Sequence, residues 1–263
     1  MNKLKNLKRI LRELKTVVIA YSGGLDSTFL LKTAVDALGK KNVLAVTARS
    51  ETYPASEHRE AVSIAKKIGA RHMTIDTEEL KIKKFRSNPV NRCYYCKSEL
   101  FKKLDGMKDR YDMAYVLDGT NYDDLKDVRY GRKAAKELGV KSPLLAARLT
   151  KADIRKFSKL LNLPTWDKPS FACLASRFPF KDEITATGLR RIGVDEDHLK
   201  GLGFKQFRVR AHKDIARIEV LKSDFKKALE FHDSMSDKLK SLGFVYVALD
   251  LGGYRTGSMH EAA

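Results

Sequence analysis

Cysteine is scarce in this sequence, with three residues in 263. So small and odd a number argues against the disulfide framework of small secreted domains, and it favours metal or redox chemistry instead. Long apolar runs are also lacking, because stretches such as residues 17–20 and 245–251 are far too short to span a bilayer. The basic helical pattern of residues 1–15 lacks the apolar core and cleavage site of a signal peptide. We therefore expect a cytoplasmic protein without a membrane partner.

Acidic residues are outnumbered, since 33 Asp and Glu stand against 52 Lys and Arg and leave a formal net charge of +19. Such an excess indicates an anionic partner, which could be a nucleotide, a nucleic acid or a phosphorylated substrate. A lysine-rich surface adapted to heat or salt would have the same charge. Charge alone therefore does not choose between tRNA and a small nucleotide.

Strand and helix patterns alternate from residue 16 onward. The expected strands are residues 16–21, 42–48, 71–76 and 115–117, and the expected helices are residues 27–38, 55–68, 127–138 and 150–161. Strands that recur at this interval with helices between them predict an α/β fold with a parallel sheet and right-handed crossovers.

The pattern changes after an irregular stretch that contains Pro164, Pro169 and Pro179. Beyond it we expect a helix over residues 187–202, hairpin strands at 204–211 and 215–221, a helix over 223–242 and a strand at 244–251. The sequence thus predicts a parallel-sheet domain over residues 1–168 and a smaller C-terminal α+β domain over residues 169–263.

The strongest local signal is a loop between the first strand and the first helix of the predicted sheet: Ser22, Gly23, Gly24, Leu25, Asp26 and Ser27. Two glycines let the backbone approach a phosphate chain, and the helix N-terminus directs N–H donors toward it. The aspartate is suited to hold Mg²⁺ or to orient the loop amides. No Gly-Lys-Ser/Thr follows, so this is not a Walker A loop. It resembles the PP-loop of the ATP pyrophosphatases, which implies cleavage of ATP between the α and β phosphates.

Two further segments fit a nucleotide site. Residues 119–124, which include Gly119 and Asp124, follow a strand and should lie at the ligand edge of the sheet, although an ordinary Asx turn explains them equally well. Lys151 falls in the first turn of a helix capped by Thr150, where the helix dipole disfavours a cation unless a phosphate is bound. A solvated lysine remains the commoner explanation.

The cysteines form a C-x-x-C pair, Cys93 and Cys96, and a distant third residue, Cys173. Three thiolates without an evident fourth ligand favour a [4Fe–4S] cluster with one open iron, because structural zinc requires four protein ligands. A redox disulfide, two unrelated thiols on a helix, and a zinc site completed by histidine are the alternatives. Cys173 lies between Lys168 and Arg177, whose charges would favour a nucleophilic thiolate, although a buried inert cysteine is the simpler explanation.

The PP-loop, residues 167–177 and the arginine-bearing residues 207–212 and 216–220 together resemble the LarE family over nearly the whole chain. That resemblance implies an ATP- and Mg²⁺-dependent sulfur transferase that adenylates the carboxylates of a pyridinium mononucleotide, releases pyrophosphate, and forms thiocarboxylates for the nickel-pincer nucleotide of lactate racemase. One branch of the family takes sulfur from a cysteine at position 173, and another uses a three-cysteine [4Fe–4S] cluster. With Cys93, Cys96 and Cys173, this sequence resembles the second branch.

The resemblance also assigns roles at the substrate site. Arg208 and Arg210 alternate along a strand and can form a fork on a substrate phosphate. Glu196, Ser176 and Arg177 are weaker candidates for the sulfur-transfer pocket. A tRNA thiolase with a three-cysteine cluster and an ATP-dependent amidotransferase or ligase are the alternative functions. We also expect a homo-oligomer.

Overall fold

The computed structural model describes residues 2–125, 130–169 and 172–255. Two compact units make up the chain. The first contains Met1–Ser50, Ala55–Glu79 and Asn91–Phe171, and the second contains Glu51–Pro54, Leu80–Val90 and Ala172–Ala263. Two short segments from the first half of the sequence therefore belong to the second unit.

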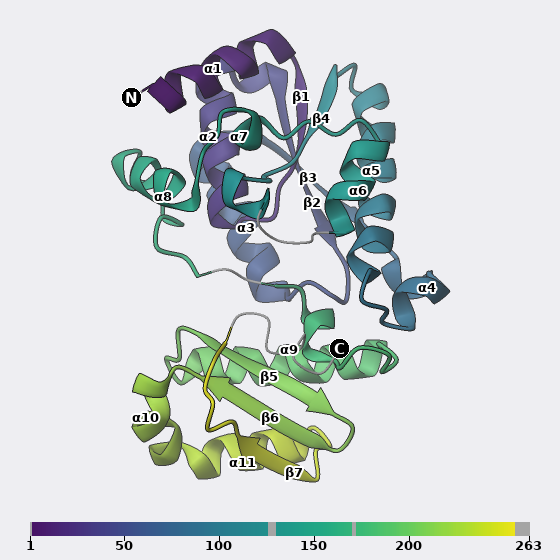
Figure 1. Cartoon of the computed structure of the whole chain (residues 1–263), viewed down its shortest axis with the longest axis vertical. Helices are drawn as coiled ribbons and strands as arrows, with labels where there is room; N and C mark the ends of the chain where they lie inside the picture. The colour runs from purple at the N-terminus through teal and green to yellow at the C-terminus, as the bar shows by residue number, and fades with distance from the viewer. Residues whose placement is uncertain (1, 126–129, 170–171, 256–263) are drawn as a thin grey trace. The chain divides into compact units, whose positions relative to one another are not determined.

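A four-stranded parallel sheet forms the centre of the first unit (Figure 1). Its spatial order is β3-β2-β1-β4, with β1 at Val17–Ala20, β2 at Val43–Arg49, β3 at Arg71–Asp76 and β4 at Tyr115–Leu117. Val17 lies opposite Val43 on one side and Tyr115 on the other, so the strands start in register. The predicted α/β fold with a parallel sheet is confirmed.

Helices cover both faces of this sheet (Figure 1). One face packs against α1 (Asn2–Leu14), α2 (Leu25–Leu38), α3 (Ala55–Ile68), α7 (Pro143–Ala146) and α8 (Lys151–Leu160). The other face packs against α5 (Arg92–Arg110) and α6 (Tyr130–Glu137). Because side chains alternate along a strand, Val17 and Ile19 enter the first core and Val18 enters the second.

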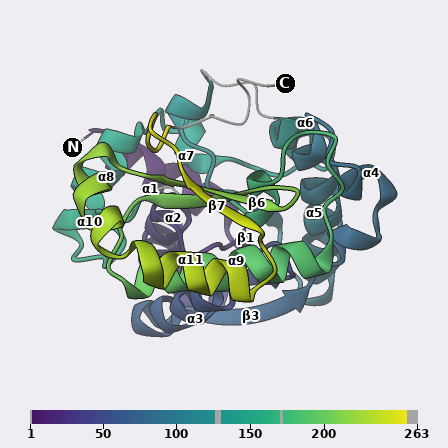
Figure 2. The ribbon, with the colours of Figure 1, turned by 90° about the horizontal axis from the view of Figure 1, so that it is seen from below.

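The second unit is built on a three-stranded sheet of order β5-β6-β7. β5 (Phe207–His212) and β6 (Ile215–Val220) form an antiparallel hairpin, and β7 (Tyr246–Leu249) runs parallel to β6. Figure 2 shows α9 (Ala186–Gly201) and α11 (His232–Ser241) along this sheet. Their buried Leu199 and Leu239 join Val209 and Ile218 in one apolar core. Two shorter helices, α4 (Lys83–Arg86) and α10 (Phe225–Glu230), complete the unit.

Several predicted boundaries were wrong. The single helix expected over residues 223–242 is divided into α10 and α11 at Phe231, which has φ −100° and ψ 16°. Weak helix formers at residues 231–234 account for this break. The last strand is shorter than expected, and α5 was not predicted. Of the helix expected over 127–138, residues 127–129 lie outside the described part of the chain.

Candidate functional site

The glycine loop between β1 and α2 is shaped by close contact with α3. Gly23 has φ +64°, a left-handed conformation that favours glycine. A Cβ atom at this position would lie 2.6 Å from the Cβ of Ala61, so no side chain fits. The two loop serines face each other, with their hydroxyl oxygens 3.1 Å apart. The Ser27 hydroxyl also donates to the carbonyl of Gly24 at 3.3 Å, which holds the loop in an open turn at the start of α2.

The segment after β4 lies against this loop. A Cβ atom on Gly119 would be 3.2 Å from the backbone nitrogen of Ser27, so the two loops are in close contact. Asp118 anchors the segment, because its carboxylate accepts hydrogen bonds from the Ser142 hydroxyl at 2.7 Å and from the Thr120 backbone at 3.1 Å. The structure therefore brings two of the predicted nucleotide-binding segments together.

The Asx-turn interpretation of residues 119–124 is consistent with the geometry. The Asn121 side chain accepts from the backbone N–H of Asp123 at 2.9 Å, and Asp124 accepts from the backbone N–H of Asn121 at 3.1 Å. The Asp123 carboxylate accepts from the backbone N–H of Lys151 at 2.8 Å. This bond joins the turn to the start of α8 and places Lys151 next to the loop segments.

The helix cap predicted at Thr150 is present and forms a capping box with Asp153 at the start of α8. Thr150 accepts from the backbone of Asp153, and the Asp153 carboxylate accepts from the backbone of Thr150. Lys3 adds an ion pair to Asp153 at 2.6 Å. Burial raises the pKa of Asp153, but the hydrogen bonds from Lys3 and Thr150 outweigh it and lower the pKa to about 2. The start of α8 is thereby fixed at the edge of the first unit that carries the glycine loop.

Two of the three cysteines lie one helical turn apart near the start of α5. Cys93 is exposed and Cys96 is partly buried. The Cys96 thiol is 3.8 Å from the Oε1 atom of Glu79, which also accepts from the Ser50 hydroxyl at 3.0 Å. Glu79 is buried and was not identified from the sequence, because no motif distinguishes it from the acidic residues around it.

The third cysteine begins a short turn in the second unit, the 3₁₀ helix Leu174–Arg177. The fully buried Arg177 holds this turn, because its Nη1 donates to the carbonyl of Ala172 and to the hydroxyl of Ser176, both at 2.8 Å. The opposite side of the guanidinium makes two bonds to the carboxylate of Glu196, at 2.8 and 2.7 Å. Such a bidentate pair fixes orientation as well as position.

The two strand arginines lie on the face of the β5–β6 hairpin opposite the apolar core. Arg210 donates to the carbonyl of Ser176 at 2.8 Å and pairs with the buried Glu219 at 2.9 Å. Arg208 lies over the ring of Tyr254, 5.1 Å from its centroid. Burial first, and then the positive charge of Arg177, lower the pKa of Arg208 to about 10. The hairpin therefore presents buried positive charge next to the Cys173 turn.

The predicted residues thus gather into two groups. The first unit contains the glycine loop, the Gly119 and Asp124 turn, Lys151 and the Cys93–Cys96 pair. The second contains Cys173, Ser176, Arg177, Glu196, Arg208 and Arg210. Within the described residues, no three His, Cys, Asp or Glu side chains are arranged to hold a metal ion. Sequence inspection missed Glu79 and Tyr254, while Glu219 was noticed only as part of a segment.

Comparisons with known proteins identify the relatives of this chain. A family model described as NAD synthase matches residues 4–117, which contain the glycine loop. An uncharacterized protein of Synechocystis is 42% identical over 262 residues, or 99% of this chain and 97% of that protein. Pyridinium-3,5-bisthiocarboxylic acid mononucleotide synthase of Lactiplantibacillus plantarum is 38% identical over 259 residues, or 98% of this chain and 94% of the relative. The chain belongs to this synthase family, LarE.

Both groups of residues fall inside the LarE match, because the similarity extends over both units. A more distant relative, the NH₃-dependent NAD⁺ synthetase of Methanococcus aeolicus, is 28% identical over 159 residues and covers 57% of the chain. In the part of the chain that the structure describes, no helix combines the length and apolar character needed to cross a bilayer.

Proposed function

We propose that this LarE-family chain is an ATP-dependent sulfur transferase that converts the carboxylates of pyridinium-3,5-biscarboxylic acid mononucleotide to thiocarboxylates. The observation that carries the proposal is the 38% identity, over nearly its whole length, to a protein named for that bisthiocarboxylic product. The same name does not favour a tRNA thiolase, because it describes a mononucleotide. The nickel-pincer cofactor as the end product and a homo-oligomeric state stay predictions of the family resemblance.

ATP activation is assigned to the first unit. The backbone amides at the start of α2 and the Ser22 and Ser27 hydroxyls are donors for the phosphate chain. Asp26 lies in the first turn of α2, and its carboxylate is the kind of oxygen ligand that Mg²⁺ prefers. A substrate carboxylate oxygen attacks the α phosphate of ATP, an acyl-adenylate forms, and pyrophosphate leaves. A carboxylate oxygen is a poor leaving group, whereas the AMP of the acyl-adenylate is a good one.

The substrate phosphate is assigned to Arg208 and Arg210. Burial and the neighbouring guanidinium of Arg177 disfavour the charge on Arg208, and a bound phosphate would compensate both effects. Arg210 is already oriented by its bonds to Ser176 and Glu219. Glu196, which binds Arg177 through both oxygens, has the geometry of a positioning residue for the Cys173 turn.

Sulfur delivery is assigned to the three cysteines, with Cys93, Cys96 and Cys173 as ligands of a [4Fe–4S] cluster. The one-turn spacing of the first two on α5 fits two ligands of a shared cluster. A bound cluster would supply sulfide at its open iron. With such a cluster bound, a sulfide sulfur would bond to the activated carbonyl carbon and AMP would leave, which gives the thiocarboxylate. A sacrificial Cys173, which would end as dehydroalanine, is the alternative sulfur source.

The activation step is tested by pyrophosphate release. We expect ATP, Mg²⁺ and the biscarboxylate mononucleotide together to release pyrophosphate, and Asp26→Asn to reduce the rate. Asp36→Asn is the matched control, because Asp36 lies on the same helix but pairs with Lys32 at the surface. Release that is independent of the mononucleotide, or equal loss in both variants, would contradict the assignment.

The sulfur source is tested by iron and sulfide analysis after anaerobic purification. We expect protein-bound iron and sulfide in the unaltered chain and a marked loss of both in Cys93→Ala. Active protein without iron would contradict the cluster. In that case, mass spectrometry that shows loss of H₂S from Cys173 after turnover would establish the sacrificial route.

A further inference from the structure

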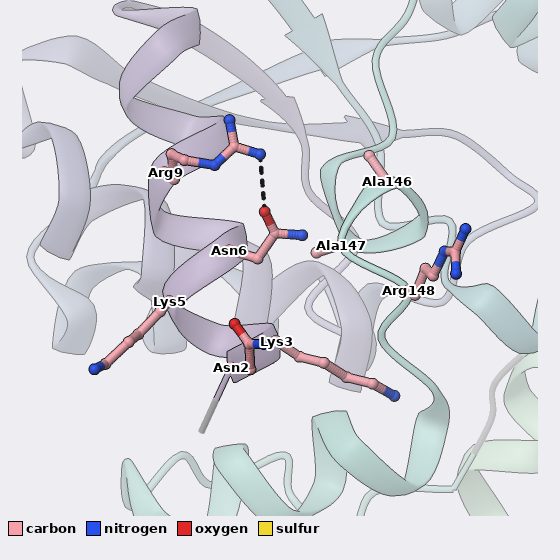
Figure 3. A pocket seen from close by; sticks show the side chains of 8 residues that line it. All are labelled: Asn2, Lys3, Lys5, Asn6, Arg9, Ala146, Ala147 and Arg148. Atoms are coloured by element: carbon pink, nitrogen blue, oxygen red, sulfur yellow. Dashed lines mark hydrogen bonds between the residues drawn. The ribbon is translucent and has the colours of Figure 1, made fainter.

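A cavity of about 560 Å³ lies in the first unit between α1 and the end of α7. Its volume falls within the range of about 300–1,000 Å³ typical of ligand sites. One face of α1, the last residue of α7 and the two residues that follow it form its walls: Asn2, Lys3, Lys5, Asn6, Arg9, Ala146, Ala147 and Arg148. Figure 3 shows Asn6 reaching from α1 toward Ala147, with Lys3 and Arg148 at the same side of the cavity.

Four of the wall residues are cations and none is a carboxylate. Lys3 pairs with Asp153 and Arg9 pairs with Glu13 and Asn6. Lys5 and Arg148 have no side-chain partner among the described residues. Positive charge is therefore left without a counter-charge on both walls of the cavity.

The dipole of α1 disfavours this positive charge further, and the backbone of Arg148 is strained. Arg148 has φ +55°, a conformation that costs a residue with a side chain roughly 1–2 kcal/mol. The first turn of α1 contains no acidic residue and instead carries Lys3 and Lys5, which the dipole at a helix N-terminus disfavours. An anion in the cavity would offset the repulsion among these cations and their unfavourable interaction with the helix dipole.

The apolar side of α1 is buried against the first unit. Leu7 and Leu11 are fully buried in the core of the first unit, and Leu4, Ile10 and Leu14 pack against it. The helix therefore has no free apolar face to insert into a lipid surface, although its pattern is that of a basic amphipathic helix. A small anion that enters the cavity is the partner that fits.

The cavity also lies close to the nucleotide-binding segments. The ion pair from Lys3 to Asp153 joins α1 to the cap of α8, and Arg148 lies three residues before Lys151. None of the loop residues 22–27 or 119–124 lines the cavity, so it is a separate space. We propose that this cavity is a second anion site, which binds a short phosphate chain of the pyrophosphate class. The adenylation described above would release such an anion, but binding itself does not depend on that function.

Calorimetry with pyrophosphate as the ligand tests the site in the full-length protein. The phosphate loop is first saturated with α,β-methylene ATP, which cannot be cleaved between its α and β phosphates, so that pyrophosphate cannot bind at the nucleotide site. The test variants are Lys5→Ala and Arg148→Asn, because asparagine tolerates the left-handed backbone at position 148. Lys8→Ala and Arg12→Ala are the matched controls, since they remove the same charge from α1 outside the cavity.

We expect pyrophosphate to bind the analogue-saturated protein more tightly than orthophosphate does. Each test variant is expected to weaken binding about threefold to fivefold, which corresponds to one exposed ion pair of up to about 1 kcal/mol. The control variants should change the pyrophosphate affinity less than twofold. No binding in the presence of the analogue, equal affinity for orthophosphate, or equal effects of test and control variants would each overturn the proposal. A failure here leaves the sulfur transferase function untouched, because no substrate or sulfur enters the measurement.

Discussion

Replacement of Gly23 by alanine is the most direct structural test of the glycine loop. The left-handed backbone at φ +64° costs an alanine about 1–2 kcal/mol. The added Cβ would also lie 2.6 Å from the Cβ and 2.9 Å from the Cα of Ala61, and overpacking of this kind costs about 1–3 kcal/mol. We therefore expect the free energy of unfolding to fall by about 2–5 kcal/mol in total, and ATP affinity to fall with it because the loop must move.

Gly139→Ala separates the two costs. Gly139 has a similar φ of +67°, but no heavy atom of the described residues would lie within 4 Å of its added Cβ. The free energy of unfolding of this variant should fall only by the backbone strain of about 1–2 kcal/mol, and the variant should bind ATP normally. Urea denaturation gives the stability of each variant, and calorimetry gives its ATP affinity. In the Gly23→Ala background, Ala61→Gly should recover part of the loss because it removes one of the two clashing atoms.

Equal stability and equal ATP affinity of Gly23→Ala and Gly139→Ala would contradict this prediction. The contact between the loop and α3 would then have no energetic consequence. An absence of any rescue by Ala61→Gly would locate the strain elsewhere in the loop.

Three further predictions concern the second unit. Glu196→Gln leaves the buried guanidinium of Arg177 without its carboxylate, and we expect it to lower the free energy of unfolding by about 3–5 kcal/mol. The control Glu183→Gln removes a carboxylate from an exposed ion pair and should lower the free energy of unfolding by less than about 1 kcal/mol. Urea denaturation measures both changes. Burial raises the pKa of Asp195 from 3.8 to about 7, so the folded state binds more protons between these values and stability falls as the pH rises through this window. Asp195→Asn should flatten that slope, and an unchanged slope would refute the assignment. Arg208→Gln should raise KM for the mononucleotide more than it lowers kcat, whereas an unchanged KM would exclude a phosphate contact.

The sequence was sufficient for the parallel sheet and for the segments at its ligand edge. Apolar β-branched runs such as Val17–Ala20 can only be buried strands in this context, and the Gly-Gly loop and the Thr150–Asp153 capping box are local patterns with local physical causes. The structure adds what these patterns do not contain, namely that the Gly119 turn lies directly against the start of α2.

Features that depend on contacts distant in sequence were not predictable. Few positions of α5 require an apolar side chain, because only Arg92, Phe101 and Leu104 are buried along it. Its sequence therefore has little apolar periodicity and resembles that of an exposed segment. The Cys96–Glu79 contact joins residues separated by 17 positions. The membership of Leu80–Val90 in the second unit depends on bonds such as that of Asn88 to the carbonyl of Pro179. No local rule describes such contacts.

The proposed function requires ATP-driven exchange of carboxylate oxygen for sulfur, and mass spectrometry of the mononucleotide measures this exchange directly. Protein purified anaerobically is incubated with ATP, Mg²⁺ and pyridinium-3,5-biscarboxylic acid mononucleotide, with and without the Asp26→Asn change. We expect a product whose mass reflects replacement of carboxylate oxygen by sulfur, formed only with ATP and in smaller amount by the variant. An unchanged substrate mass accompanied by pyrophosphate release, or sulfur incorporation without ATP, would contradict the proposed function.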